Sequence, residues 1–254
     1  MLSVVLATFN EEKNIARCLE AVKNLAEEII VVDGGSVDKT VEIAKKYGAK
    51  VTVTDNPPIF HINKQKAVDL AKGDWVLQLD ADEVVTDDLK KEIREVIKSK
   101  NAADGYCLKR RNYFLGKWLQ KGGQYPDPVI RLFQKSKGKF PCKSVHEQIE
   151  INGEVETLKN DLLHDTAPTL ARYLSNNDRY AALTAQEFKE EKIPLNILTA
   201  LKYLLIKPVY TFLLLFIRHK GFRDGYPGFI FAFYSGFLFA KAYLKYSKQR
   251  TVNR

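Results

Sequence analysis

The segment WVLQLDADEV, residues 75–84, places two carboxylates, Asp80 and Asp82, directly after an apolar run. Side chains two positions apart leave a strand on the same face, and two anions about 4 Å apart repel by roughly 4 kcal/mol at an effective dielectric near 20. A divalent cation held by oxygen ligands offsets this repulsion and normally keeps positions open for substrate phosphates. The pair therefore indicates a metal site, although an isolated DxD is more often only a polar turn.

Two further groups of polar side chains follow apolar runs in the same way. Thr8 ends the first run and is followed by Asn10 and Glu11, and Asp33 ends the second run and opens the turn DGGSVDKT. The paired glycines of this turn permit a tight bend with positive φ, which leaves the Asp33 carboxylate facing the crevice. Such turns are common, so this one indicates a binding site only together with the neighbouring elements.

Strand-like and helix-like segments alternate through the first hundred residues. Apolar, β-branched runs lie at 3–8, 29–32, 50–54 and 75–80, and amphipathic segments lie between them at 11–25, 38–47 and 62–72. This order predicts an α/β fold with a mainly parallel, Rossmann-like sheet flanked by helices, and ligands at the carboxyl ends of its strands. The polar groups described above all follow such ends.

From Gly105 onward the pattern becomes irregular. A strand near 105–109 precedes the loop LGKWLQKGGQYPDP, the strand VIRLF and the segment KFPCKSVHEQIEI, and helices resume after Pro168. Long loops on a rigid scaffold are where substrates are selected. We therefore expect a catalytic domain at 1–165, with acceptor loops over about 105–165, and a helical C-terminal extension at 166–254.

The composition indicates a folded protein of a reducing compartment. The chain has 254 residues and is 45% hydrophobic, which is ample for a core. Its three cysteines, Cys18, Cys107 and Cys142, are widely spaced and lack CxxC spacing. Neither a disulfide framework nor a zinc site is expected, and a cytoplasmic location fits.

The net charge of +9 is concentrated near the C-terminus. Residues 195–254 contain ten Lys or Arg and a single acid, Asp224, whereas the 30 basic and 30 acidic residues before them balance. An anionic surface is therefore the expected partner of this region. The segments VYTFLLLFI and YPGFIFAFYSGFLFA are too apolar for a nucleic-acid groove, and their Lys, Arg and Tyr edges suit a lipid surface.

The same region is not a simple membrane span. Residues 226–244 would form a helix about 28 Å long, close to a bilayer core, but Gly228 and Gly236 interrupt it. The preceding run contains Lys202 and Lys207, which are costly at bilayer depth. We expect a monotopic attachment to the cytoplasmic leaflet, the alternative being a soluble subdomain packed on the sheet.

Other enzyme classes explain the acid pair less well. VLQLDADEV also matches the hhhhDxDxV motif of haloacid-dehalogenase-like phosphatases, with Asp80 as nucleophile and Asp82 as acid, but no later apolar strand ends in the second acidic pair that this class needs. No G-x-G-x-x-G follows a strand, which disfavours a Rossmann dehydrogenase, and a Walker A motif is absent.

Taken together, several segments resemble a family 2 glycosyltransferase with the GT-A fold. They are ATFNEEKNIARCLEAV, EEIIVVDGGSVDKTVEIAKKYGAKV, INKQKAVDLAKGDWVLQLDADEVV, NYFLGKWLQKGGQYPDPVIRLF and VHE. More narrowly, they are similar to the branch that includes lipopolysaccharide-core β-glucosyltransferases. The resemblance implies inverting transfer from a nucleotide-sugar, preferably a UDP-sugar, assisted by Mg²⁺ or Mn²⁺.

The resemblance also implies roles around the donor. Thr8 and Asp33 would contact the nucleotide base, with Asn10 and Glu11 beside them, although the turn reads DGGSVD where the family usually has D-S/D-G-S-x-D. Lys64 stands where many relatives have an arginine near the nucleotide. In the acidic pair, Asp80 would meet the ribose region and the metal, and Asp82 would bind the metal that bridges the diphosphate.

The acceptor side departs further from the family pattern, because the usual E-D base motif is missing. Val145-His146-Glu147 stands in its place, which makes Glu147 the candidate general base and Asp127 of QYPDP the alternative. His146 and His164 are candidate metal ligands, with ordinary hydrogen bonding as the competing interpretation. The residues expected to line the acceptor site are Trp118, Gln124, Tyr125, Arg131 and His146, and core packing is equally consistent for Trp118.

Three functional hypotheses follow. The leading one is a glycosyltransferase that acts on a lipid-linked or cell-envelope acceptor, located in the cytoplasm and peripheral on the cell membrane. A polyprenyl-phosphate sugar synthase would share the donor site but use a lipid phosphate as acceptor. An inactive nucleotide-sugar or carbohydrate-binding scaffold is the non-enzyme alternative, against which the retained Asp33, Asp80, Asp82 and Glu147 argue. No nucleic-acid partner is expected.

Overall fold

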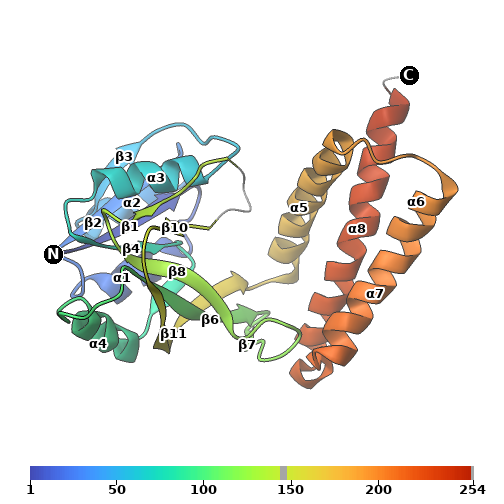
Figure 1. Cartoon of the computed structure of the whole chain (residues 1–254). Helices are drawn as coiled ribbons and strands as arrows, with labels where there is room; N and C mark the ends of the chain where they lie inside the picture. The colour runs from blue at the N-terminus through green and yellow to red at the C-terminus, as the bar shows by residue number, and fades with distance from the viewer. Residues whose placement is uncertain (144–147, 253–254) are drawn as a thin grey trace. The chain divides into compact units, whose positions relative to one another are not determined.

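The computed structural model describes residues 1–143 and 148–252, which form two compact units (Figure 1). The first unit comprises Met1–Arg110 and Asp127–His164, and the second comprises Arg111–Pro126 and Asp165–Arg254. Residues 111–126, which the sequence predicts as part of the catalytic domain, belong to the second unit.

The first four strands form the parallel part of the sheet. They are β1 (Leu2–Thr8), β2 (Glu28–Asp33), β3 (Lys50–Val53) and β4 (Trp75–Leu79). Their order across the sheet is β3-β2-β1-β4, and Thr8 lies opposite Asp33 in the register of β1 and β2. The strand order reverses between β1 and β4, and such a switch point opens a crevice at the carboxyl ends of the strands.

The later strands add antiparallel pairs to this sheet. The longer ones are β5 (Glu83–Val85), β6 (Gly105–Phe114), β8 (Asp127–Gln134) and β11 (Val155–Ala167), and the short ones are β7 (Lys117–Trp118), β9 (Gly138–Lys139) and β10 (Glu150–Ile151). Strand β8 pairs with β4 and β5 pairs with β11, with Glu83 opposite His164. These pairings bring side chains distant in sequence to the end of β4.

Four helices cover the two faces of the parallel strands. They are α1 (Ile15–Val22), α2 (Thr40–Lys46), α3 (His61–Leu70) and α4 (Asp87–Val96). Successive β1 side chains alternate between faces: Val4 and Leu6 pack in a core with α1, α2 and α4, whereas Val5 packs with α3. Each such fully buried side chain contributes roughly 1.5–3 kcal/mol, so both layers hold the strand ends in place.

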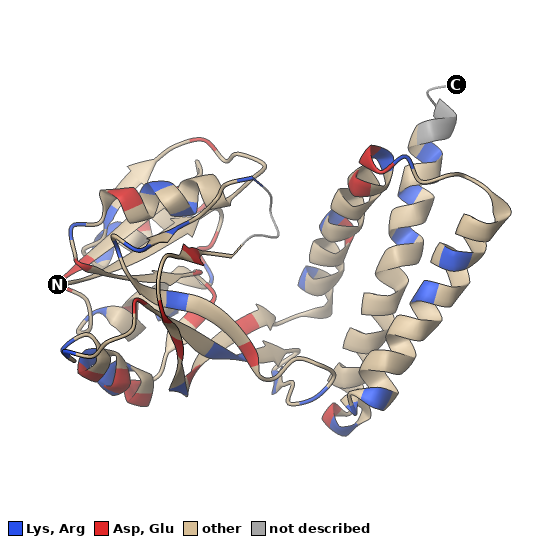
Figure 2. Cartoon of the chain, in the orientation of Figure 1, with Lys and Arg blue, Asp and Glu red and all other residues tan. Residues whose placement is uncertain are grey.

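The second unit is mainly helical. It contains α5 (Leu170–Glu190), the helix Ile197–Arg218 built from α6 (Ile197–Leu201), the π-helical η1 (Lys202–Ile206), α7 (Lys207–Leu213) and the π-helical η2 (Leu214–Arg218), then η3 (Gly221–Asp224) and α8 (Tyr226–Val252). Acidic side chains are frequent in the first unit and on α5 but scarce on the two later helices (Figure 2). The C-terminal region is therefore helical, as the sequence predicts, and its two later helices carry basic and apolar side chains.

The two glycines that the sequence analysis took as interruptions lie inside the continuous α8. A Cβ on Gly228 would lie 2.1 Å from the Gly221 carbonyl oxygen, and a Cβ on Gly236 would lie 2.5 Å from the Pro208 carbonyl oxygen. These positions lack side chains because backbone approaches them closely, as in tightly packed helix pairs. The interpretation of both glycines as helix interruptions is therefore wrong.

The predicted α/β fold is confirmed. Every expected strand and helix of the first hundred residues is present, the parallel strands are flanked by helices, and a helical extension follows them. The antiparallel half of the sheet was not anticipated in detail, because its strands are separated by long irregular loops.

Candidate active site

The candidate site lies at the carboxyl ends of β1, β2 and β4. Asp33 is fully buried and closes its own turn: one carboxylate oxygen accepts hydrogen bonds from Thr8 Oγ1 at 2.8 Å and Ser36 Oγ at 2.6 Å. The other accepts from the Gly35 and Ser36 backbone N–H groups at 3.1 and 2.7 Å. A carboxylate has about four acceptor positions, and all four are used within this turn and by Thr8. The hydrogen bond between Thr8 and Asp33 therefore fixes the local structure of the site.

The loop after β1 is fixed against the same turn. Asn10 has φ 56°, its backbone N–H donates to Ser36 Oγ at 2.8 Å, and its side-chain oxygen accepts from the Val37 N–H at 2.9 Å. The Glu11 N–H donates to Thr40 Oγ1 at 2.7 Å. The two loops that would contact a nucleotide are thus held together before any ligand binds.

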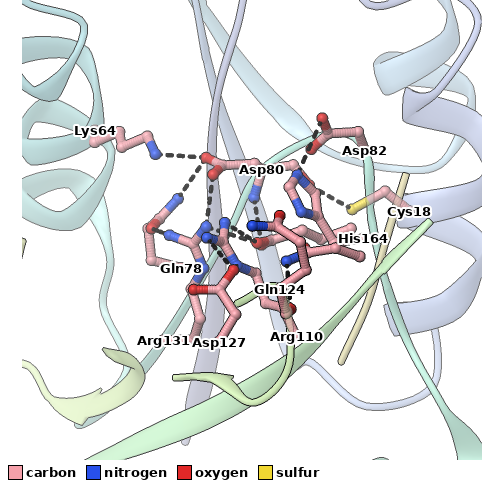
Figure 3. A network of polar contacts seen from close by, with 12 residues as sticks. Cys18, Lys64, Gln78, Asp80, Asp82, Arg110, Gln124, Asp127, Arg131 and His164 are labelled. Atoms are coloured by element: carbon pink, nitrogen blue, oxygen red, sulfur yellow. Dashed lines mark hydrogen bonds and ion pairs between the residues drawn. The ribbon is translucent and has the colours of Figure 1, made fainter. Parts of the chain in front are cut away.

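Asp80, at the end of β4, lies between two cations (Figure 3). Its Oδ1 is 2.5 Å from Lys64 Nζ and its Oδ2 is 2.6 Å from Arg131 Nη2. Burial raises the pKa of Asp80, but Arg131 and Lys64 outweigh it and hold the pKa well below its usual range. The carboxylate is therefore ionised, and about a third of its side chain remains exposed for a ligand.

A buried carboxylate, Glu83, supports Asp80 from behind. Its Oε2 accepts from the Asp80 backbone N–H at 3.0 Å, and its Oε1 lies 2.6 Å from Arg131 Nη2 and 3.7 Å from Arg110 Nη1. Arg131 also donates to Gln78, and the pKa of Arg131 is raised because Asp80 and Glu83 outweigh its burial. Removing one partner of a buried ion pair is strongly destabilising, because the other charge is left buried and unpaired. This network therefore fixes the geometry of the β4 end.

Two residues predicted for the acceptor side belong to this network. Arg131, expected to contact the acceptor, is 6% exposed and contacts Gln78, Asp80 and Glu83. Asp127, the alternative base, accepts from Arg110 Nε at 3.0 Å and forms an ion pair with Arg110 Nη2 at 2.7 Å. Both are therefore engaged in ion pairs within the first unit.

Asp82 lies beside His164, which comes from β11. His164 Nε2 is 3.6 Å from Asp82 Oδ2, and β11 places it there by pairing with β5. Burial lowers the pKa of His164, but Asp82 and Glu83 raise it more, so the pKa is raised overall. The two side chains form a mostly buried polar pair, with Asp82 30% exposed and His164 15% exposed.

This pair fits a divalent cation. Two ligand atoms each about 2.1 Å from one ion are at most about 4.2 Å apart, and the observed separation of 3.6 Å is within that limit. No third His, Cys, Asp or Glu joins them within the described residues. A cation with two protein ligands keeps positions for water and phosphate oxygens. Asp80 differs, because both of its oxygens face cationic side chains.

The other expected acceptor residues lie in the second unit, in the segment Arg111–Pro126. The rings of Trp118 and Tyr125 meet edge to face at 5.2 Å between centroids, and Arg111 stacks on Trp118 at 4.7 Å. The Nε1 of Trp118 is buried without a hydrogen-bond partner among the described residues. The Gln124 backbone oxygen accepts from Asn112 at 3.1 Å. Because the Trp118 N–H is buried, only the exposed parts of the half-buried Trp118 and Tyr125 rings are available to a ligand.

Two predicted residues, His146 and Glu147, lie outside the described residues. Conversely, sequence reasoning missed Glu83, Arg110 and Gln78, which all contact the predicted site residues. A signal existed only for Glu83, a charged side chain next to Val84 and Val85 in β5, because Arg110 is one of three consecutive basic residues in β6. Their partners come from antiparallel pairings that a single sequence does not reveal.

Comparison with known proteins provides independent information. A family model described as "Glycosyl transferase family 2" matches residues 3–150. The chain is 28% identical over 269 residues to an uncharacterized glycosyltransferase of Rickettsia bellii, covering 99% of this chain and 87% of that protein. It is 28% identical over 268 residues to the lipopolysaccharide core biosynthesis glycosyltransferase LpsC of Rhizobium meliloti, covering 99% of this chain and 95% of that protein.

Solved structures also show similarity. S. aureus TarS in complex with UDP-GlcNAc aligns with a TM-score of 0.49 and 18% sequence identity, covering 91% of this chain and 79% of that chain.

Proposed function

Because the chain belongs to glycosyltransferase family 2, we propose that it transfers a sugar, with inversion at the anomeric carbon, from a nucleotide-sugar to a lipid-linked or cell-envelope glycan. The observation that carries the proposal is the arrangement at the end of β4. There the ionised Asp80 is held between Lys64 and Arg131, and Asp82 lies 3.6 Å from His164. A ribose needs an acceptor for its hydroxyl groups, and a diphosphate needs cationic charge.

Each side chain of the donor site has a distinct task in this proposal. Asp80 accepts hydrogen bonds from the ribose hydroxyl groups, because its carboxylate is ionised and about a third of its side chain is exposed. Asp82 and His164 would hold Mg²⁺ or Mn²⁺, and the cation would supply positive charge for the leaving diphosphate. Lys64 places a further positive charge beside Asp80. Glu83 and Arg131 keep these groups in position.

The acceptor hydroxyl requires a base that removes its proton as its oxygen bonds to the anomeric carbon. Glu147 is our candidate, and Asp127 is the alternative. The Asp127 carboxylate has a structural partner in Arg110, and this supports Glu147 as the first residue to test. General bases contribute typically 10²- to 10⁴-fold to a rate.

The similarity to LpsC supports a cell-envelope acceptor, because that protein is described as a lipopolysaccharide core biosynthesis glycosyltransferase. The aromatic pair of Trp118 and Tyr125 is half-buried, and its exposed part would supply a surface suited to a sugar ring. We further propose a cytoplasmic enzyme, peripheral on the cell membrane, since nucleotide-sugars are made in the cytoplasm and the acceptor would be lipid-linked.

The experiment that tests the proposal is a donor-hydrolysis screen. Purified protein is incubated with UDP-, GDP- and dTDP-sugars, with Mn²⁺ or with a chelator, and release of the nucleoside diphosphate is measured. We expect Mn²⁺-dependent hydrolysis of one nucleotide class, preferably UDP. Binding without hydrolysis of any donor, in the presence of candidate glycan acceptors, would instead identify an inactive scaffold. Transfer to a polyprenyl phosphate in place of a glycan would identify the sugar synthase alternative.

A further inference from the structure

The helix Ile197–Arg218 exposes large apolar side chains at every fourth position. They are Leu201, Leu205, Val209, Leu213 and Ile217, and each is between 47% and 55% exposed. In a regular α-helix of 3.6 residues per turn, positions four apart advance by about 40° each, so such a stripe would wind around the helix. The π-helical turns η1 and η2 counter this drift, because their i→i+5 bonds place more residues in a turn.

The result is a straight apolar face, roughly 24 Å long. The other side of the helix packs on α8, where Tyr203 and Pro208 are buried. Lys207 also points toward this side, since its Nζ lies 4.4 Å from the centroid of the Phe239 ring. The five side chains are here called the apolar stripe. The other lysine of this helix, Lys202, is exposed near the start of the stripe, with its Nζ 5.0 Å from the centroid of the Tyr203 ring.

Positive charge lies at both ends of the apolar stripe. Lys202 is exposed near its start, and Arg218, Lys220 and Arg223 are exposed at the end of the helix and in the turn that follows it. The single acid of residues 195–254, Asp224, is buried and accepts hydrogen bonds from the backbone of Gln120 and Lys121. The charge available near the stripe is therefore basic, as Figure 2 shows for this helix and α8. This complements an anionic phospholipid surface.

The packing of helix α5 is inconsistent with a hairpin of the helix Ile197–Arg218 and α8 that spans the bilayer. It packs along the C-terminal half of α8, where Asp178 pairs with Lys241 at 2.8 Å and Lys245 at 3.1 Å. Figure 1 shows α8 between α5 and the helix Ile197–Arg218. The outer face of α5 exposes charged side chains, among them Arg172, Arg179, Lys189 and Glu190. Placing these at bilayer depth would be costly, whereas an in-plane orientation leaves them in water.

We propose that the apolar stripe docks flat on an anionic phospholipid leaflet, with α5 facing water. The proposal deepens the proposed function and rests on it only for the lipid-linked acceptor. The turn after the helix contains Asp224, which holds the segment with Trp118 and Tyr125 through the bonds to Gln120 and Lys121. Docking would therefore bring the segment expected to bind the acceptor close to the lipid surface.

The first test is co-flotation with phosphatidylethanolamine vesicles that contain phosphatidylglycerol. We expect the double substitution Leu205→Glu and Leu213→Glu to weaken binding about tenfold or more, because it places two charges in the contact. Val155→Glu is the matched control, since Val155 is an exposed apolar residue of the first unit, and it should bind as wild type does. High salt should weaken binding without abolishing it.

Two results would overturn the proposal. One is a wild-type protein that does not float with these vesicles. The other is a folded double variant, verified by circular dichroism, that binds as well as wild type. A discrete dimer that ignores vesicles and that the double variant dissociates would assign the stripe to an interface between copies instead.

A second measurement stays valid even if the double variant fails to fold. Leu201→Cys and Ile217→Cys, sixteen positions apart along the helix, are labelled singly with a fluorophore in a chain carrying Cys107→Ser and Cys142→Ser, because Cys18 is buried. Quenching by lipids spin-labelled at different depths should report the same shallow depth for both sites. A spanning helix would separate the two depths by up to about 24 Å and would contradict the proposal.

Donor hydrolysis without vesicles separates this proposal from the proposed function. The Leu205→Glu and Leu213→Glu variant should hydrolyse the donor as wild type does while it loses vesicle binding. If wild type hydrolyses no donor yet floats with vesicles, the proposed function fails and the docking surface stands. Loss of donor hydrolysis together with vesicle binding, in a folded variant, would contradict a separate docking role.

Discussion

At the residue scale, the site combines a pair suited to a metal with a carboxylate held by cations. The sequence predicted Asp80 and Asp82 as neighbours at the carboxyl end of one strand, and the family resemblance placed Lys64 near the nucleotide. In the structure Lys64, from α3, is in direct contact with Asp80. The residues alone indicated one shared metal site, and only the resemblance gave the two acids different roles. Asp80 faces Lys64 and Arg131, whereas Asp82 faces His164, and that difference arises from antiparallel pairings with β8 and β11.

The first prediction concerns Asp82. We expect Asp82→Asn to fold normally and to lose at least about 100-fold in Mn²⁺-dependent turnover, because the amide removes an anionic ligand where a metal contributes several kcal/mol. Turnover is compared with wild type across a Mn²⁺ titration, and Mn²⁺ binding is measured separately by calorimetry in the presence of nucleoside diphosphate. Near-normal turnover and Mn²⁺ binding would show that Asp82 holds no metal.

The second prediction distinguishes the two candidate bases. Glu147→Gln should reduce transfer to acceptor by roughly 10²- to 10⁴-fold and leave donor affinity unchanged, as loss of a general base does. Asp127→Asn should act mainly on stability, because it breaks the ion pair with Arg110. Transfer rates and donor Kd are measured for both. The opposite pattern would make Asp127 the base.

The third prediction concerns the network behind Asp80. Arg131→Ala should lower the free energy of unfolding by roughly 3–5 kcal/mol, because it leaves the carboxylates of Asp80 and Glu83 without their shared partner in a buried site. Urea unfolding of wild type and variant gives the difference. Arg94→Ala is the control for loss of an exposed guanidinium, since Arg94 is exposed on α4 and donates to the Asn24 backbone oxygen. A loss below about 1 kcal/mol would show that the network adds little beyond an ordinary surface pair.

At the element scale, the sequence predicted the parallel half of the sheet well because each strand and helix there has its own local signal. Thr86 followed by Asp87 and Asp88, for example, has the pattern of a helix N-terminus, and the Thr86 Oγ1 accepts the Leu89 N–H at 3.3 Å at the start of α4. The π-helical turns had no such signal. They depend on how the helix Ile197–Arg218 packs on α8, which is decided by tertiary contacts such as the approach of Pro208 to Gly236.

The fourth prediction concerns Glu28, which ties β1, β2 and β3 together. Burial raises its pKa, but hydrogen bonds from Ser3 at 2.6 Å, the Lys72 N–H at 2.6 Å and Lys50 at 3.0 Å outweigh it and lower the pKa from 4.5 to about 2. A lowered folded-state pKa contributes stability that is complete above about pH 4.5 and is lost as the pH falls toward 2. The shift corresponds to about 3 kcal/mol.

The measurement is the free energy of unfolding between about pH 6 and pH 3. Wild type should lose stability steeply over this range, and Glu28→Gln should start lower and lose less, because the amide does not titrate. Two curves that stay parallel throughout would show that Glu28 does not contribute to the acid sensitivity of the sheet.

At the scale of the whole molecule, the segment Arg111–Pro126 is part of the helical unit. Its anchor is Asp224, which is 4% exposed and accepts from the Gln120 N–H at 3.2 Å and the Lys121 N–H at 2.8 Å. The Lys117 ammonium donates to the Asp224 backbone oxygen at 2.8 Å. The sequence showed Asp224 only as the single acid of a basic region, and its role became visible because residues more than a hundred positions apart meet in the fold.

The last prediction follows from this anchor. Asp224→Asn keeps the shape of the side chain but replaces one acceptor oxygen with a donor, which would face a backbone N–H. Hydrogen bonds to a charged group contribute about 1.5–3 kcal/mol, so hydrogen exchange at the Gln120 and Lys121 amides should accelerate by roughly tenfold or more. The KM for acceptor should rise while donor hydrolysis is retained, because Asp224 lies outside the donor site.

The control is Asp178→Asn, the same change in an exposed ion pair with Lys241. It should alter neither the exchange of the Gln120 and Lys121 amides nor the KM for acceptor. Unchanged exchange at both amides would show that another contact holds the segment in place.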